Sequence, residues 1–152
     1  MVPLSRKSPV PPEHCNLARA VELIGDRWTL LILRSAMYGV RRFDDFQTEL
    51  GTPRTILSGR LKALVEAGLL DKRIYKVEGR RARPEYVLTD QGEALRPVLI
   101  ALTQWGDEWL GTEGQPPISF TDMQSRQAVR AAFVTPEGRE VSVDSLRIVL
   151  RR

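Results

Sequence analysis

Apolar residues recur at helical spacing in three successive stretches of the first third of the chain. Residues 15–25 carry them at three- and four-residue intervals and end at Gly25, which predicts a short amphipathic helix. Residues 26–39 are apolar on nearly every side after Asp26, which is placed to cap the start, so this stretch predicts a helix in the middle of the core. Residues 41–51 return to a one-sided pattern and predict a third short helix.

A fourth helix is predicted directly after this, with Thr52 as its N-cap and Pro53 as its first helical residue. At 100° per residue, its apolar side chains fall on one side: Ile56, Leu57, Leu61, Leu64 and Val65. The opposite side is small, polar and basic, with Thr55, Ser58, Gly59 and Lys62, and Arg54 projects from the first turn. The pattern therefore predicts a helix that buries one face and presents a polar, basic face to solvent.

The periodicity changes after Gly68. Residues 69–77 and 85–89 are rich in strand formers and flank a basic, turn-rich loop, so they predict an antiparallel hairpin with a basic tip. Short helices, the last with an exposed basic face, followed by such a hairpin are the order of a winged helix-turn-helix. The predicted fold class is mainly α with a small β-hairpin wing.

The remainder of the chain predicts a long helix and a less regular tail. Thr89 can cap a helix that runs to about residue 111, and Pro97 inside it predicts a kink or a break. From residue 112 the composition shifts to that of a linker. A hairpin around residues 136–139 and a further strand at 146–150 are expected beyond it.

Composition narrows the class of protein. The chain has 152 residues, 42% of them hydrophobic and 28% charged, which is typical of one main globular domain with an appendage. No apolar run is long enough to span a bilayer and the first residues lack the apolar core of a secretory signal, so we expect no membrane partner and a cytoplasmic location. One cysteine and one histidine cannot fill a tetrahedral zinc site without recruiting several carboxylates, so a structural metal is not expected. No cofactor is predicted either.

The positive charge is concentrated in one region. The whole chain carries +4, whereas Pro53 to Arg83 holds nine basic and three acidic residues, a net +6. On the winged-helix hypothesis, the helix face would lie in the major groove of double-stranded DNA, with Arg54, Thr55, Ser58 and Lys62 as base readers. The predicted wing residues Arg80, Arg81 and Arg83 would lie near phosphates or reach the minor groove.

Simpler interpretations exist for some of these residues. Charged runs are often solvated surface, although the position of this one after a polar helix face favours a nucleic-acid partner. Arg60 points toward the edge of the buried face and is expected to form a structural ion pair, with Glu66 or Asp45 as candidate partners. Gly59 costs a helix about 1 kcal/mol relative to alanine. Close approach of DNA would explain a glycine at this position, and so would neutral drift of the sequence.

Several motifs in order resemble the HxlR family of bacterial winged-helix regulators, relatives of the MarR group. They are a cysteine before the first helix, LIGDRWTLLILR, the RRFDDF segment, ILSGRLKALVEAGLL and RPEYVLTDQGEAL, which together with the tryptophan-bearing end cover Cys15 to Leu110. The chain departs from the family pattern at Asn16 and Pro53, where proline and serine are usual. These departures affect the helix entry and the base contacts.

The resemblance implies a homodimer that binds a partly palindromic operator. In such proteins the first and last helices form the dimer interface, which here implicates Leu17, Leu95, Leu99, Leu102, Trp105 and Trp109. The alternative for the tryptophans is packing within one subunit. The expected organisation is an N-terminal arm at 1–14, a DNA-binding and dimerisation domain at 15–111, and an extension at 112–152 that is either extra dimer contact or an effector-responsive flap.

The adjacent His14 and Cys15 suggest a nucleophile and base, but no orienting group, oxyanion site or pocket can be identified, so no catalytic residue and no enzyme are predicted. The resemblance instead implies a sensor thiol at Cys15, responsive to an oxidant or electrophile. The alternative is a small buried residue at the dimer interface. Two other functions stay open: a winged-helix protein-interaction module without DNA binding, and a regulator responsive to a small-molecule effector with no thiol role.

Overall fold

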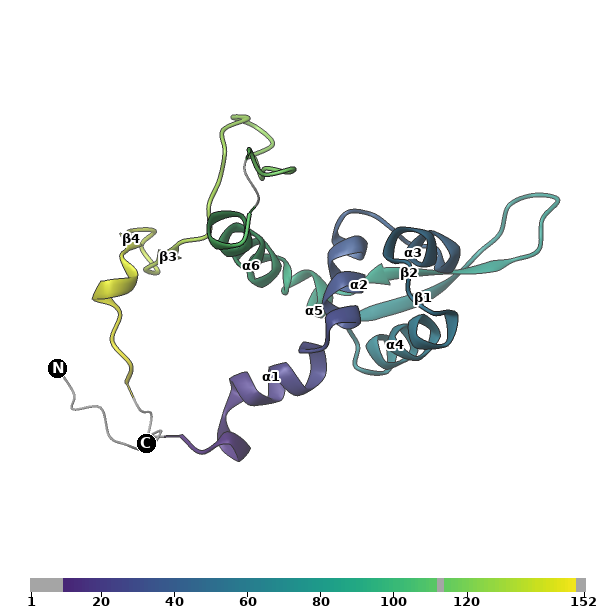
Figure 1. Ribbon diagram of the computed structural model, residues 1–152, viewed down its shortest axis with the longest axis horizontal. Coiled ribbons are helices and arrows are strands. Elements are labelled where there is room, and N and C mark those ends of the chain that lie inside the picture. Colours follow the sequence, from purple (N-terminus) through teal and green to yellow (C-terminus); the bar gives the residue numbers. More distant parts are fainter. Residues whose placement is uncertain (1–9, 112–113, 150–152) are drawn as a thin grey trace. The chain divides into compact units, whose positions relative to one another are not determined.

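A computed structural model describes residues 10–111 and 114–149 of the chain. The described residues divide into two compact units, one formed by Val10–Arg96 and the other by the residues from Pro97 onward. The first unit contains η1 (Pro12–His14), α1 (Asn16–Ile24), α2 (Arg27–Met37), α3 (Phe43–Leu50), α4 (Arg54–Glu66), β1 (Leu70–Tyr75), β2 (Arg83–Leu88) and α5 (Asp90–Glu93), as Figure 1 shows. The helix α6 (Arg96–Trp109) begins at the boundary, and β3 (Phe133–Val134), β4 (Glu140–Val141) and η2 (Val143–Ser145) follow.

The predicted helix signals act as expected at three points. Asp26 caps α2, because its carboxylate accepts hydrogen bonds from the backbone amides of Trp28 and Thr29 at 3.1 and 3.2 Å. Gly51 ends α3 in the left-handed conformation, with φ of 61°. The hydroxyl of Thr89 accepts from the amide of Gly92 at 3.1 Å and so caps α5.

The core of the first unit forms where α2 packs against α3, α4 and β2. Its buried side chains include Ile32, Leu33, Phe46, Leu57, Leu61, Leu64 and Leu70. Polar contacts accompany this packing. The buried Ser35 donates from Oγ to Glu49 Oε1 at 2.8 Å, and Arg34 Nη2 pairs with the same oxygen at 2.6 Å. The prediction of α2 as the central helix is confirmed.

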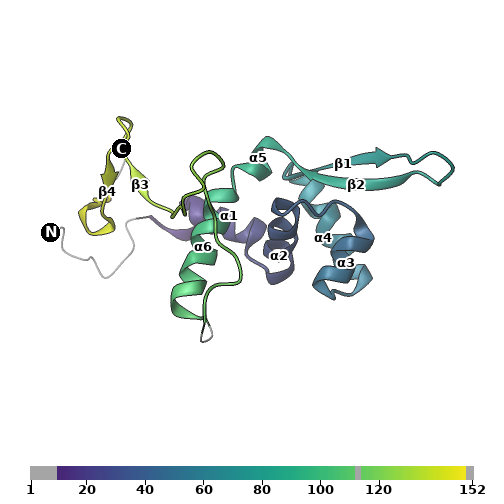
Figure 2. The ribbon, with the colours of Figure 1, turned by 90° about the horizontal axis from the view of Figure 1, so that it is seen from above.

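The wing is the predicted antiparallel hairpin. Leu70 pairs with Leu88 at its base and Tyr75 with Arg83 at its outer end. A short bridge between Arg42 and Glu85 joins the start of α3 to the second strand. Both views show the hairpin extending beyond α3 and α4 (Figure 1 and Figure 2).

Several sequence expectations need correction. The helix α4 begins at Arg54, so Pro53 is the N-cap, and Thr52 is buried with its hydroxyl unpaired among the described residues. Ile56 lies at the edge of the apolar side and is 39% exposed, so it is not a core residue. Of the two outcomes expected at Pro97, a break is observed, between α5 and α6, because the ring of proline favours the first turn of a helix.

The second unit contains α6 and the predicted tail hairpin. Strands β3 and β4 pair antiparallel around Gly138, which has φ of 82°. The side-chain amide of Gln104 holds the tail on α6 by donating to Val129 O at 2.9 Å and accepting from Ala131 N at 2.8 Å. The prediction of a strand at 146–150 is wrong for residues 146–149, which form no strand. Residue 150 lies outside the described residues. Within the described ranges, no helix is both long and apolar enough to cross a membrane.

Candidate nucleic-acid interface

The outward face of α4 is open to solvent at the predicted positions. Arg54, Thr55, Ser58 and Lys62 are all exposed, while the opposite side of the helix supplies core leucines. Lys62 pairs with Glu66 one turn later at 3.7 Å, an exposed pair that leaves the lysine accessible. The helix therefore presents a polar, basic surface of the kind that enters a DNA groove.

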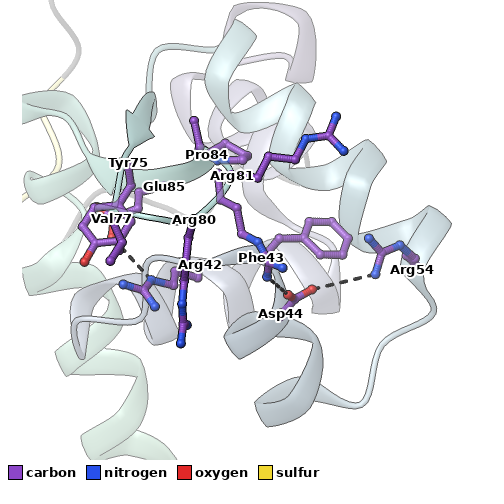
Figure 3. A pocket seen from close by; sticks show the side chains of 12 residues that line it. Arg42, Phe43, Asp44, Arg54, Tyr75, Val77, Arg80, Arg81, Pro84 and Glu85 are labelled. Atoms are coloured by element: carbon purple, nitrogen blue, oxygen red, sulfur yellow. Dashed lines mark hydrogen bonds and ion pairs between the residues drawn. The ribbon is translucent and has the colours of Figure 1, made fainter.

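A groove of about 850 Å³ lies at the start of α4. Figure 3 shows the side chains that line it. The start of α3, Arg54 of α4 and the wing from Tyr75 to Glu85 form its walls. Five arginines line the groove (Arg42, Arg54, Arg80, Arg81 and Arg83) against two carboxylates, Asp44 and Glu85. The structure thus brings four of the seven predicted DNA-binding residues together in one positively charged concavity.

Asp44 lies between two of these arginines. Its Oδ2 is 3.0 Å from Arg83 Nη1, and its Oδ1 is 3.8 Å from Arg54 Nη1. The guanidinium of Arg54 also lies over the ring of Phe43, 4.7 Å from the centroid, and is 3.4 Å from the side-chain oxygen of Gln47. Arg54 is therefore held by three side chains of α3.

Arg42 is a second residue fixed at the groove, and the sequence reasoning missed it. Its Nε is 3.6 Å from Glu85 Oε1, and its guanidinium lies 4.5 Å from the centroid of the Tyr75 ring. The sequence signal was the pair of arginines directly before the third helix. The bridge between Arg42 and Glu85, which the sequence does not reveal, brings this segment beside the wing.

The tip of the wing carries two exposed arginines, Arg80 and Arg81. Gly79 turns the chain with φ of 76°, and the amide of Arg80 donates to Val77 O at 3.0 Å. The side chains of Arg80 and Arg81 have no hydrogen-bond or ion-pair partner among the described residues. They are available to phosphates.

Arg60 has the structural role expected of it but with a different partner. Its Nε is 3.3 Å from Asp26 Oδ1, so it joins α4 to the cap of α2 rather than pairing with Glu66 or Asp45. Burial opposes ionisation of the Asp26 carboxyl, but hydrogen bonds from Thr29 and the charge of Arg60 outweigh it and lower the pKa of Asp26. The ion pair stabilises the packing of α2 and α4.

The described lining of the groove includes none of the remaining predicted residues. Cys15 is half-buried at the N-cap of α1, and its side chain makes no capping hydrogen bond. Of the six apolar interface candidates, four are strongly exposed, Leu95 is half-buried and Leu99 is buried; the exposed four are Leu17, Leu102, Trp105 and Trp109. Within the described ranges, no group of three His, Cys, Asp or Glu side chains is placed to hold a metal ion.

The comparisons with known proteins identify the family. The HxlR-like helix-turn-helix profile matches residues 23–114, so the chain belongs to this family. The chain is 50% identical over 105 residues to the HTH-type transcriptional regulator Rv3095 of Mycobacterium tuberculosis, covering 69% of this chain and 65% of that protein, which is less than two thirds of its length. The regulator YvaP of Bacillus subtilis is 33% identical over 100 residues, covering 64% of this chain and 91% of its own.

Solved structures agree with the fold. PA1607, described as a candidate transcription factor, matches with a TM-score of 0.74 and 34% identity over 89% of this chain and 94% of that chain. The reduced form of the transcriptional regulator YodB of B. subtilis matches with a TM-score of 0.54 and 27% identity over 62% of this chain and 93% of that chain. The fold class predicted from the sequence, a winged helix, is confirmed, and these relatives are regulators rather than enzymes.

Proposed function

We propose that this protein is a transcriptional regulator that binds specific sequences in double-stranded DNA. The observation that carries the proposal is the junction of the exposed α4 face with the five-arginine groove. A helix in the major groove reads base edges, and a basic wing beside it contacts the phosphate backbone. The regulators Rv3095 and YvaP support the same function.

The two parts of this surface do different work. Arg54, Thr55, Ser58 and Lys62 contact base edges, so they determine sequence preference. Arg80 and Arg81 at the wing tip, which have no partner among the described residues, bind phosphates and add affinity that depends on salt. Arg83 is partly neutralised by Asp44 and contributes less of this unspecific affinity than the free pair.

A binding selection from a library of randomised duplexes tests the proposal, because it finds a preferred sequence directly and requires no operator to be chosen beforehand. Recovery of one enriched motif is the expected result, and recovery of unrelated sequences would contradict it. Lys62→Ala should relax the preference within the motif. Arg81→Ala should leave the motif intact and flatten the salt dependence by about 0.9 in log–log slope. A wing variant that changes the motif would reverse the assignment of readers.

The active form is a homodimer in this proposal. The helix α1 has no buried residue despite its apolar side, and α6 leaves Leu102, Trp105 and Trp109 about half or more exposed. Aromatic side chains of this kind are favoured anchors of protein interfaces. A two-fold dimer reads two related half-sites about 10 base pairs or a multiple of that apart, so the selected motif should be partly palindromic.

Cys15 is the proposed sensor of an oxidant or electrophile. YodB is known in a reduced and in a diamide-treated form, which associates a relative of this fold with thiol oxidation. In the present chain the thiol lies at the start of α1, one of the two apolar helices of the proposed dimer. Because it is the sole cysteine, oxidation would yield a disulfide between the two subunits, a mixed disulfide or a sulfenic acid. Each product would change the environment of the dimer interface.

A further inference from the structure

The groove contains arginines in two different states. Arg80 and Arg81 are unpaired in the part of the chain that the structure describes, whereas Arg54 and Arg83 share the carboxylate of Asp44. In Figure 3 a dashed line joins Asp44 to Arg54. The two held arginines come from different elements, the first turn of α4 and the first residue of β2, so one side chain of α3 controls both.

These ion pairs do little for folding stability. The side chains of Arg54, Arg83 and Asp44 are 70%, 69% and 60% exposed, and pairs in such positions are screened by water and salt. The pairing nevertheless determines where the two guanidinium groups lie. Its consequence therefore concerns what the arginines bind, rather than how firmly the unit folds.

Arg54 is the more constrained of the two. Besides Asp44, the ring of Phe43 lies under its guanidinium and the side-chain oxygen of Gln47 is within 3.4 Å. A side chain held in one orientation loses less entropy when it makes a bidentate contact with a base edge. A carboxylate in the same place competes with every DNA phosphate for the same guanidinium.

We propose that Asp44 is a positioning residue that sets sequence discrimination, by orienting Arg54 toward the bases and by withholding Arg54 and Arg83 from phosphates of any sequence. This inference rests on the proposed DNA-binding function. Unspecific binding depends on phosphate contacts, so it should rise when the carboxylate is removed. Binding to a preferred sequence also needs the oriented Arg54, so the affinity for that sequence should not rise as the unspecific affinity does.

Asp44→Asn removes the charge at constant size, and Asp45→Asn is the matched control. Asp45 is the next residue of α3, is exposed, and has no ion-pair partner among the described residues, so its substitution measures the general effect of one lost negative charge. The probes are the duplex recovered from the randomised library and a base-scrambled copy. Fluorescence anisotropy in a salt series gives affinities and salt slopes for both, and thermal melting verifies that each variant is folded.

For the scrambled duplex, Asp44→Asn should bind about 3- to 30-fold more tightly than the control variant, the range expected for release from two exposed pairs. The salt slope should steepen by up to about 1.8, the value for two additional phosphate contacts. Affinity for the selected duplex should not exceed that of the control, so the ratio between the two duplexes falls by about tenfold. Asp44→Glu retains the charge and should restore most of this ratio.

Two results would overturn the proposal and can be told apart. If Asp44→Asn and Asp45→Asn raise both affinities by the same factor, Asp44 acts only as a general charge and the inference fails while DNA recognition stands. If the wild-type protein itself binds both duplexes equally, the proposed function fails and the role of Asp44 fails with it.

Discussion

Gly59 offers a substitution whose effects on stability and on DNA binding have opposite signs. It is an exposed residue within α4, between Ser58 and Arg60 in the chain, where a helix former would ordinarily be better. Apart from its chain neighbours and the backbone of its own helix, a Cβ atom at this position would have no described atom within 4 Å. Gly59→Ala should therefore gain the full helix propensity difference of about 1 kcal/mol in the free energy of unfolding, since no steric cost offsets it.

Whether alanine in place of glycine raises or lowers stability depends on the space around the added methyl group. At Gly92 this space is occupied. A Cβ there would lie 2.2 Å from the carbonyl oxygen of Leu69 and 2.9 Å from Leu88 Cδ2, so Gly92→Ala should destabilise the same unit. Thermal melting checks both variants, with shifts of about 4–8 °C per kcal/mol expected for a unit of this size. A lower melting temperature for Gly59→Ala would refute the reasoning about α4.

The second readout for Gly59→Ala is DNA binding. On the proposed interface the added methyl group enters the space between helix and DNA, where about 1.4 kcal/mol of overpacking would weaken binding roughly tenfold. Because the variant is expected to be more stable than the wild type, misfolding cannot account for such a loss. Unchanged affinity for the selected duplex would show that DNA does not approach this part of α4 closely.

Three other substitutions test separate parts of the account. Asp26→Ala should lower the free energy of unfolding by about 1 kcal/mol at neutral pH through loss of the α2 cap. Because folding lowers the pKa of Asp26, this contribution is present above the ordinary pKa of an aspartate and disappears as the pH falls through the lowered pKa. Urea denaturation should therefore show the stabilities of the two proteins converging in acid, and a difference that stays constant with pH would contradict the assignment. Trp109→Ala should weaken self-association, measured by sedimentation, without lowering the melting temperature of the monomer; an unchanged dimer would place this 68% exposed tryptophan outside the interface. Cys15→Ser should leave DNA affinity intact and abolish any response to diamide, and a retained response would remove Cys15 from the mechanism.

Local signals explain why much of the fold could be predicted from the sequence. The cap at Asp26, the left-handed Gly51 and the strand-forming stretches around the basic loop each depend on neighbouring residues, so their positions follow from the sequence. The errors arose where local signals compete. Thr52 has the chemistry of an N-cap, but its side chain is buried and the helix starts two residues later.

The candidate site was only partly predictable, because it depends on contacts between distant residues. Exposure of the α4 face followed from helical periodicity alone. The pairing of Asp44 with Arg83 spans 39 residues, and that of Arg60 with Asp26 joins two helices, so neither partner could be selected from spacing. The sequence showed which residue types were present near the interface, whereas the fold determined which of them are held and which are free.

In the proposed function, the surface formed by α4 and the wing recognises particular DNA sequences. The most direct measurement is fluorescence anisotropy with the selected duplex and its scrambled copy, between about 50 and about 200 mM salt. Both affinities should fall as salt rises, and the selected duplex should remain bound at least about a thousandfold more tightly than its scrambled copy. Equal affinity for the two duplexes at every salt concentration would contradict the proposed function.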